Sequence, residues 1–382
     1  MAKKNVRFSK ALTIFLSILS LIIGFCAGVV GNYVYDRKTN NIYKSDYVYG
    51  DLEMHFLELG NGHTGDSCYI KCGDVDILVD AGSRTSSSTT IANYLDTQVT
   101  DKKLEYIIVT HADRDHIAGF AGDSKNPSIF ARYEVDIIID FPLTNKVVSK
   151  ETGVLLKDYY SERDSRVEKG AKHYNALQCY NNTDGGQRTY KLSDTITLNI
   201  LYNYYYENSS PDENNYSVCF QIEDGDNKYL FTGDLELEGE EKLVANNSLD
   251  KVKLFKAGHH GSKTSSNDCL LDVIQPEVCV VTCCAGSVEY TQNLENTFPT
   301  QLFINRISKW TDKVYVTTVG TIAKDDSGKW KDVSYTSLNG IVVVKVNNGL
   351  LNVECSNNNT VLKDTDWFKN NRTTPDAWKS VA

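Results

Sequence analysis

The sequence lacks two features that would direct its interpretation: cysteine pairs at zinc-finger spacing, and an excess of basic residues. No Cys-x-x-Cys pair occurs among its ten cysteines, which excludes the common zinc-finger classes. Residues 51–382 hold 33 Lys and Arg against 48 Asp and Glu, a formal charge of −15. Because sequence-independent nucleic-acid binding draws on a basic surface, a nuclease of this composition would need a local basic groove or bound metal.

The cysteines that are present do not form an evident disulfide framework. Nine follow Cys26, an odd number that cannot all pair within one chain. Cys68 and Cys72 lie too far apart in an apparent strand to bridge each other, and the neighbours Cys283 and Cys284 rarely would. We therefore expect mostly buried free thiols, which fit poorly with an oxidising exterior.

An uncharged apolar stretch at residues 11–34 is long enough to span a membrane, since a spanning helix takes about 20 residues. Four basic residues precede it, and this excess favours a cytoplasmic N-terminus. We expect a basic cytoplasmic tail at 1–10, a single-pass cell-membrane anchor at 11–34, a linker at 35–50 and an extracytoplasmic domain beyond. A cleaved signal peptide is the alternative, but its apolar region is usually only about 7–15 residues long. No protein partner can be identified.

From residue 51 onward, short β-rich runs alternate with helix-like segments, which predicts sheets with helices outside. We expect one catalytic domain at 51–355 and a polar tail at 356–382. The aperiodic segment at about 143–193 is interpreted as an insertion, and a solvated surface elaboration is favoured over a cover for the substrate. The predicted strands are 54–59, 68–72, 75–80, 106–110, 135–139, 195–201, 216–222, 228–232, 252–256 and 278–282. Helices are predicted through 91–95 and after 234, 266 and 299.

The segment YIIVTHADRDHIAGF carries the strongest chemical signal. A buried strand ends at Thr110, and the six residues that follow are His111, Ala112, Asp113, Arg114, Asp115 and His116. Chemistry in α/β folds is placed at strand ends. Two imidazoles and two carboxylates in one turn can point at one locus and bind one or two divalent cations. The alternative is a polar surface turn in which Asp115 caps the next helix.

Two later strand ends supply the same residue types. KYLFTGDLE presents Asp234, and KVKLFKAGHHGSKTSS presents His259 and His260. Taken singly, Asp234 could be a helix N-cap, and the two histidines could be surface residues. Their joint occurrence favours a metal site, with either His259 or His260 as the ligand.

In order along the chain, HFLELGNGHTGDS, ILVDAGS, VTHADRDHIAGF, NYSVCFQI, FTGD and KAGHHGSKTSS resemble the metallo-β-lactamase domain of the ComEC/Rec2 DNA-uptake family. The resemblance covers about residues 54–320. It implies an α/β fold, the four-layer αββα sandwich, here preceded by the N-terminal membrane helix. It also implies two metal ions, with Asp234 bridging them and Asp80 as a structural residue beside the site. The ligands it implies are His111, Asp115, His116, Asp234 and His259.

The sequence departs from the superfamily pattern at three places. The usual HxHxDH appears as HxDxDH, so Asp113 replaces a histidine ligand with an oxygen ligand. At the position of a further family histidine, residues 214–217 offer only amide and hydroxyl groups. Near the C-terminal end, residues 297–300 stand where the family often has a His-Pro-His-like run. By ligand preference, one oxygen-rich subsite should favour Mn²⁺ or Mg²⁺, and the other should suit Zn²⁺.

The chemistry we expect is hydrolysis by a hydroxide held between the metal ions, with a phosphodiester as the leading bond type. Asp115, Asp234 and His260 are the expected catalytic residues: Asp115 would orient the water, and His260 or Ser262 would contact the leaving oxygen. The substrate would be a nucleic acid or another phosphoester. Two alternatives stay open: a cell-envelope phosphoester hydrolase of the same fold, and a degenerate domain that only binds a ligand or partner.

Overall fold

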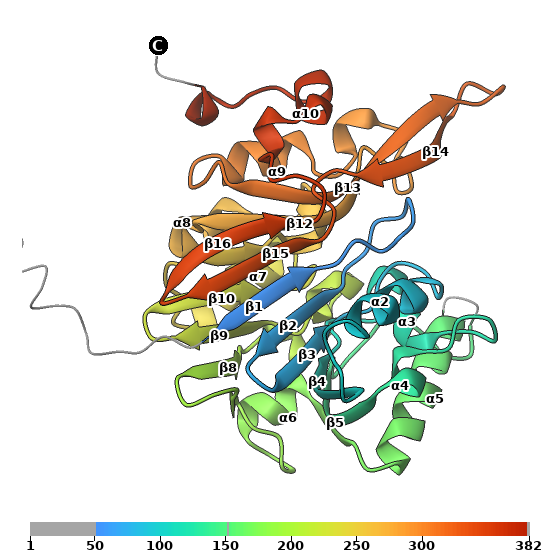
Figure 1. Ribbon diagram of the computed structural model, residues 1–382, viewed down its shortest axis with the longest axis vertical. Coiled ribbons are helices and arrows are strands. Elements are labelled where there is room, and N and C mark those ends of the chain that lie inside the picture. The colour runs from blue at the N-terminus through green and yellow to red at the C-terminus, as the bar shows by residue number, and fades with distance from the viewer. Residues whose placement is uncertain (1–50, 151–152, 380–382) are drawn as a thin grey trace, which may run out of the picture. The chain divides into compact units, whose positions relative to one another are not determined.

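The computed structural model describes residues 51–150 and 153–379, which build two eight-stranded sheets (Figure 1). The first sheet has the order β16-β15-β1-β2-β3-β4-β5-β6. Its strands β1 to β3 form an antiparallel meander, and β3 to β6 run parallel. Its strands are β1 (Leu52–Phe56), β2 (Cys68–Cys72), β3 (Val75–Val79), β4 (Lys103–Ile108), β5 (Glu134–Asp140), β6 (Lys172–Asn175), β15 (Val342–Asn347) and β16 (Leu350–Cys355).

The second sheet repeats this plan with the order β14-β13-β12-β11-β10-β9-β8-β7. Strands β7 to β10 are antiparallel, and β10 to β13 are parallel. Its strands are β7 (Thr189–Lys191), β8 (Ile196–Ile200), β9 (Phe220–Asp224), β10 (Asn227–Phe231), β11 (Leu254–Lys256), β12 (Val278–Ala285), β13 (Val314–Lys324) and β14 (Trp330–Ser337).

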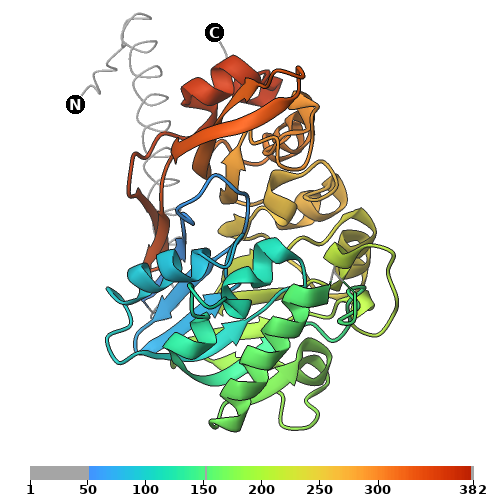
Figure 2. The same ribbon diagram turned by 90° about the vertical axis from the view of Figure 1, so that its right-hand side faces the viewer.

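Helices flank both sheets (Figures 1 and 2). The helices that accompany the first sheet are α2 (Ser87–Leu95), α3 (Arg114–Ala121), α4 (Ile129–Arg132), α5 (Val154–Glu168) and α6 (Ala176–Asn181). Those that accompany the second are α7 (Leu237–Asn246), α8 (Asp268–Ile274), α9 (Gln301–Ile307) and α10 (Asp366–Asn371). The short 3-10 turns are η2 (Tyr204–Tyr206), η3 (Glu213–Tyr216), η4 (Gly258–Gly261), η5 (Leu294–Asn296), η6 (Leu362–Asp364) and η7 (Asp376–Trp378).

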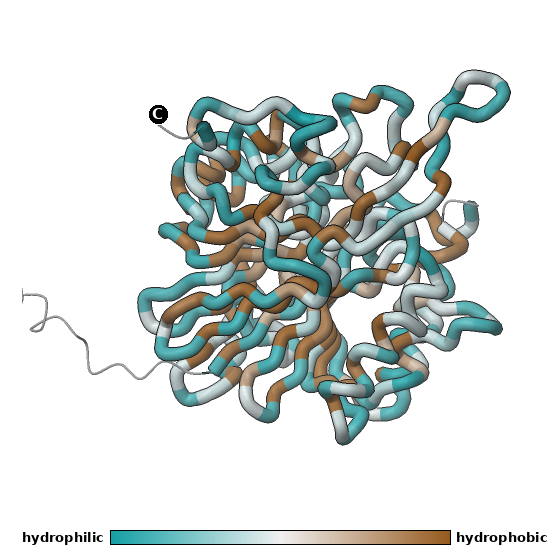
Figure 3. The backbone as a smooth tube through the Cα atoms, turned by 45° about the horizontal axis from the view of Figure 1, so that its top comes forward, coloured by the Kyte–Doolittle hydropathy of each residue, from teal (hydrophilic) through white to brown (hydrophobic). Residues whose placement is uncertain are grey.

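The core has two parts, and together they account for the layering. One cluster fills the space between the sheets, where Phe56 of β1 stacks on Phe231 of β10 and Phe231 stacks on Phe220 of β9. The same cluster continues between the first sheet and its helices, where it includes Phe120 of α3. The other lies between the second sheet and its helices and includes Phe303 of α9. Figure 3 shows hydrophobic stretches along the stacked strands and hydrophilic turns at the periphery. The predicted two-sheet α/β sandwich is confirmed.

The predicted membrane anchor at 11–34 lies outside the described residues and stays a prediction. Across residues 51–150 and 153–379, no helix combines the length and the apolar character that a membrane crossing requires.

Most of the predicted strands are found within a few residues of their expected bounds. The run at 216–222 is an exception, because residues 213–216 form the 3-10 turn η3 and the strand β9 begins only at Phe220. The segment at 143–193 is more integral than the sequence suggested: it supplies α5 and α6, and it adds an edge strand to each sheet, β6 and β7. The tail after Cys355 also packs into the body, where Phe368 and Trp378 are buried.

The nine cysteines that follow Cys26 are all free thiols, and seven of them are buried, as the sequence predicted. The exceptions are Cys269 and Cys355, which are partly buried.

Candidate metal centre

The turn after β4 brings two imidazoles into the protein interior. His111 and His116 are fully buried, and their ring centroids lie 4.1 Å apart. Asp80, in the left-handed region with φ +56°, holds this turn in place. Its carboxylate accepts hydrogen bonds from the Thr110 backbone N–H and hydroxyl, both at 2.8 Å, and lies 2.8 Å from His116 Nδ1. The contact to Nδ1 leaves His116 Nε2 facing the site.

The second sheet contributes from the ends of β10 and β11. Asp234 follows Gly233, whose φ is +54°, and a Cβ at that glycine would lie 2.7 Å from Ser217 Oγ. Only glycine therefore fits this turn without displacing a neighbour. His259 and His260 both have positive φ, +46° and +54°. Two successive non-glycine residues in this region are costly, and such strain clusters at functional sites.

These strand ends converge on one buried cluster. His116 Nε2 lies 3.1 Å from Asp234 Oδ2, and His260 Nε2 lies 3.2 Å from the same oxygen. His260 Nε2 is also 3.5 Å from Asp115 Oδ2. The structure therefore brings together five of the predicted residues: His111, Asp115, His116, Asp234 and His260.

The cluster has the composition of a cation site. Three of its buried polar atoms have no hydrogen-bond partner among the described residues: His111 Nε2, Asp234 Oδ1 and His260 Nε2. Buried polar atoms are normally paired, so such atoms call for a ligand or an ion. Two overlapping groups have ligand atoms within 4.8 Å of one another: His111, His116 and Asp234, and Asp115, His116 and His260. Imidazole and carboxylate ligands of this kind fit one or two divalent metal ions.

The charges in the cluster reinforce one another. Burial lowers the pKa of His116, but the carboxylates of Asp234 and Asp80 offset this and hold the pKa well above its usual value. Burial also lowers the pKa of His260, but the carboxylates of Asp234 and Asp66 raise it by more, so this pKa too lies well above its usual value. Burial raises the pKa of Asp234, while the two imidazoles bring it well below its usual range. Without a metal, the site is thus a set of imidazolium–carboxylate pairs.

Two predicted ligands lie outside this cluster. Asp113 Oδ1 forms an ion pair with Lys146 Nζ at 2.5 Å, and its other oxygen lies 3.6 Å from His111 Nε2. His259 turns away, with Nδ1 3.2 Å from Glu236 Oε1 and 3.1 Å from Thr264 Oγ1. Of the two histidines, His260 lies in the cluster and His259 does not.

A pocket of about 640 Å³ opens over the cluster. Its polar wall includes Asp113, Asp115, Asp234, Lys146 and Arg114, and its apolar wall comes from α5. Tyr290 also lines the pocket and donates a hydrogen bond of 2.7 Å to Asp115 Oδ2. The segment at 143–193 therefore supplies both a cation and an apolar surface beside the cluster.

The places where family histidines are missing have structural roles here. Ser217 Oγ donates to the Asn214 carbonyl at 2.7 Å and accepts from the Asp234 backbone N–H at 3.0 Å, which fixes the loop that carries Asp234. Thr300 caps the N-terminus of α9, and the Phe298 ring lies 6.0 Å from the His260 ring. Neither segment adds an imidazole or a carboxylate to the cluster, although Asn214 lines the pocket.

Sequence reasoning missed the parts that depend on distant contacts. Lys146 and Tyr290 are far from the motif in sequence, and Asp66 lies in the segment HFLELGNGHTGDS, where it was not singled out as a site residue. Lys256 carried little signal, because it ends the run KVKLFK, in which Lys251 and Lys253 are also charged.

Comparison with known proteins agrees with this geometry. Residues 61–139 and 210–283 match the family model described as the metallo-beta-lactamase superfamily. "ComE operon protein 3" of Bacillus subtilis is 27% identical over 184 residues, which cover 47% of this chain and 20% of that protein. "Recombination protein 2" of Haemophilus influenzae is 36% identical over 69 residues, which cover 18% of this chain and 8% of that protein. The chain thus spans a fifth or less of the length of these relatives.

Among solved structures, the metallo-beta-lactamase fold protein YhfI from Bacillus subtilis superposes with a TM-score of 0.42 at 11% identity, covering 74% of this chain and 100% of that one. This likeness is too distant to bear on the site. The family match and the sequence relatives confirm the resemblance that the motifs indicated, to the metallo-β-lactamase superfamily and, within it, to the ComEC/Rec2 group.

Proposed function

We propose that this chain is a metal-dependent hydrolase that cleaves phosphodiester bonds in the pocket above His111, His116, Asp234 and His260. The observation that carries the proposal is the buried His/Asp cluster with unpartnered ligand atoms at the base of a pocket that also holds a lysine. The metal-dependent hydrolase fold is common to the superfamily, whereas the phosphodiester is our inference.

His111, His116 and Asp234 would hold one divalent cation, and Asp115 and His260 would complete a second position beside it. Bound cations of this type acidify a water molecule and stabilise negative charge on the oxygens of the attacked phosphoryl group. The identity of the metals, Zn²⁺ or Mn²⁺, belongs to the proposal.

The residues of this chain would perform the remaining tasks. Asp115 is held by the Tyr290 hydroxyl and lines the pocket, so it can accept a hydrogen bond from the attacking water. Lys146 and Arg114 line the same pocket and can donate to the non-bridging oxygens of a phosphate. Four aspartates line the same pocket, so these two cations would attract a phosphate only together with the bound metal ions.

A nucleic-acid strand is the favoured substrate, and the name of the Haemophilus influenzae relative, a recombination protein, agrees with it. A phosphodiester of the cell envelope would bind to the same cations. An experiment must therefore distinguish this substrate class from nucleic acid. An anchor at 11–34 would place the reaction at a membrane, as the sequence predicts.

The test is hydrolysis by the full chain, purified in mild detergent and loaded with Mn²⁺ or Zn²⁺. We expect turnover of bis(p-nitrophenyl) phosphate, slower turnover of p-nitrophenyl phosphate and none of a β-lactam. Single-stranded DNA and a teichoic-acid type polymer then distinguish the two substrate classes.

Asp234→Asn should abolish both metal retention and turnover, whereas Asp326→Asn, at an exposed position, should change neither. A metal-loaded protein that cleaves none of the phosphodiesters would refute the proposal and favour a binding module. A protein that retains no metal would also remove the basis for it.

A further inference from the structure

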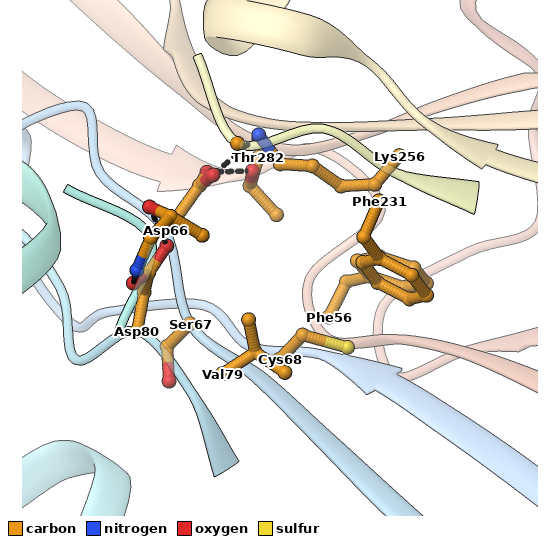
Figure 4. Close-up of a pocket in the computed structure, with 11 residues that line it drawn as sticks. Phe56, Asp66, Ser67, Cys68, Val79, Asp80, Phe231, Lys256 and Thr282 are labelled. Atoms are coloured by element: carbon orange, nitrogen blue, oxygen red, sulfur yellow. Dashed lines mark hydrogen bonds and ion pairs between the residues drawn. The ribbon is translucent and has the colours of Figure 1, made fainter. Parts of the chain in front are cut away.

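A buried lysine lies beneath the metal cluster and takes no part in the chemistry proposed so far. Lys256 ends β11, and its side chain is only 5% exposed. Its ammonium forms an ion pair with Asp66 Oδ2 (Figure 4). It also lies 3.9 Å from Asp234 Oδ1. Burying a charge in this way is costly unless it is paired, so the lysine requires a partner at this position.

The space around Lys256 has no room for an anionic ligand. It adjoins a cavity of about 10 Å³ whose lining includes the apolar side chains of Phe56, Val79 and Phe231. A cavity needs roughly 10–15 Å³ to hold one water molecule, so at most a single uncharged water fits here. The charge of Lys256 is therefore balanced by protein carboxylates, foremost by Asp66.

Asp66 is itself close enough to the centre to bind a metal. With Asp234 and His260 it forms one group whose ligand atoms lie within 4.8 Å of one another, and with Asp80 and His116 it forms another. Both of its oxygens are engaged. Oδ1 accepts from the Thr282 hydroxyl and lies 3.1 Å from His260 Nδ1, and Oδ2 contacts Lys256.

We propose that Lys256 is a positioning residue that holds Asp66 out of the metal coordination sphere. Asp66 then serves only to orient His260 through Nδ1, together with the Thr282 carbonyl, which lies 2.9 Å from the same nitrogen. His260 Nε2 thus faces Asp234, and the cluster keeps its share of imidazole ligands. Lys256 would thereby set the preference of the site between Zn²⁺ and harder cations such as Mn²⁺. This inference rests on the proposed function to the extent that the cluster binds a divalent metal.

The arrangement makes opposite predictions for the two partners. Lys256→Met leaves Asp66 Oδ2 without its counter-charge, so the carboxylate is free to become an additional oxygen ligand. Asp66→Asn leaves Lys256 with Asp234 Oδ1 as its nearest remaining carboxylate oxygen, and the ammonium then competes with the metal. The double variant Lys256→Met/Asp66→Asn removes both charges together and should restore the original ligand set.

The experiment uses the full chain in detergent, titrated with Co²⁺ and read by visible absorption, with Zn²⁺ and Mn²⁺ affinities from equilibrium dialysis. Lys256→Met should weaken the Co²⁺ absorption per ion, because coordination number rises, and shift the Mn²⁺ to Zn²⁺ affinity ratio by about tenfold or more toward Mn²⁺. Asp66→Asn should lower all three affinities by about 10- to 100-fold, because the Lys256 ammonium then competes with the metal for Asp234, while the amide oxygen that replaces the carboxylate can still accept from His260 Nδ1. The double variant should resemble the original protein.

Lys253→Met is the matched control, because Lys253 directly precedes β11 and pairs at the surface with Glu277. Folding of each variant is checked by thermal unfolding. A folded Lys256→Met protein with unchanged spectrum and metal preference would overturn the inference. If Lys256→Met does not fold, the double variant decides, and an altered Co²⁺ spectrum there would overturn it. Failure of the unaltered protein to bind Co²⁺ would instead refute the proposed metal site.

Discussion

The base and the mouth of the pocket are built in different ways. At the base, His111, His116, Asp234 and His260 are at most 1% exposed and come from strand ends of both sheets. At the mouth, Lys146, Arg114 and Tyr290 are partly or fully exposed and come from loops and from the start of α3. The base is held by strained backbone and buried pairs, whereas the mouth is held by a few hydrogen bonds. Metal chemistry should therefore depend on the base, and substrate choice on the mouth.

The largest difference is expected within the base itself, between two neighbouring histidines. His260→Ala should lower metal affinity by more than about 100-fold, since even outer-shell partners account for about 10- to 100-fold. His259→Ala should leave metal content unchanged, because His259 contacts Glu236 and Thr264 rather than the cluster. Metal analysis after dialysis measures both. The reverse order would show that the ligand assignment is wrong.

The base should also respond to pH in a way that the mouth does not. The pKa values of His116 and His260 are higher in the folded than in the unfolded protein. Their ion pairs therefore contribute their full stabilisation below about pH 6.5, the unfolded pKa, and this stabilisation is lost as pH rises through the folded pKa. The lowered pKa of Asp234 adds stability above about pH 4 that is lost as pH falls. The metal-free protein should therefore unfold at a higher temperature at pH 6 than at pH 9.

Stabilisation by metal should have the opposite pH dependence and increase with pH. Metal ligands must be deprotonated, so binding releases protons. The rise in unfolding temperature on adding Zn²⁺ should be larger at pH 8 than at pH 6. Thermal unfolding with and without Zn²⁺ measures it. A shift independent of pH would show that the imidazoles do not change protonation when metal binds.

At the mouth, Lys146→Ala should weaken substrate binding while metal content stays the same. A charge-assisted hydrogen bond is worth about 1.5–3 kcal/mol, so KM for a phosphodiester should rise about tenfold or more. Lys150→Ala is the control, since Lys150 is exposed on the same segment. If Lys146→Ala lost metal, the ion pair between Lys146 and Asp113 would be needed for metal binding rather than for substrate binding.

The smallest effect is expected for Tyr290→Phe, which removes the hydrogen bond to Asp115 Oδ2. Because a single hydrogen bond contributes about 1 kcal/mol, kcat should fall about fivefold, with unchanged metal content. Tyr204→Phe, at a partly exposed tyrosine, serves as control. An unchanged kcat would exclude Asp115 from the orientation of water.

The sequence was informative wherever local pattern determines structure. The alternation of apolar residues located most strands, and the strand end at Thr110 located the metal-binding turn. It could not choose between His259 and His260, because the choice depends on two successive left-handed residues that no local pattern reveals. It also could not connect Asp66 with Lys256, which are 190 residues apart and meet only when the two sheets pack.

The segment at 143–193 illustrates a different limit. Its helices are polar on average, and its strands β6 and β7 have only four and three residues, too few for a periodic signal. Their position is determined by pairing with β5 and β8 rather than by their own composition. Tertiary context decided the outcome here.

The free cysteines make local opening of the structure measurable by thiol labelling. Cys68 lines the cavity beneath the cluster, Cys179 lies in α6, and Cys355 is partly exposed at the edge of the first sheet. A thiol reagent reaches a buried cysteine only when the surrounding structure opens, so each labelling rate reports the free energy of a different opening event. Followed by mass spectrometry, metal binding should slow the modification of Cys68 and leave that of Cys355 unchanged.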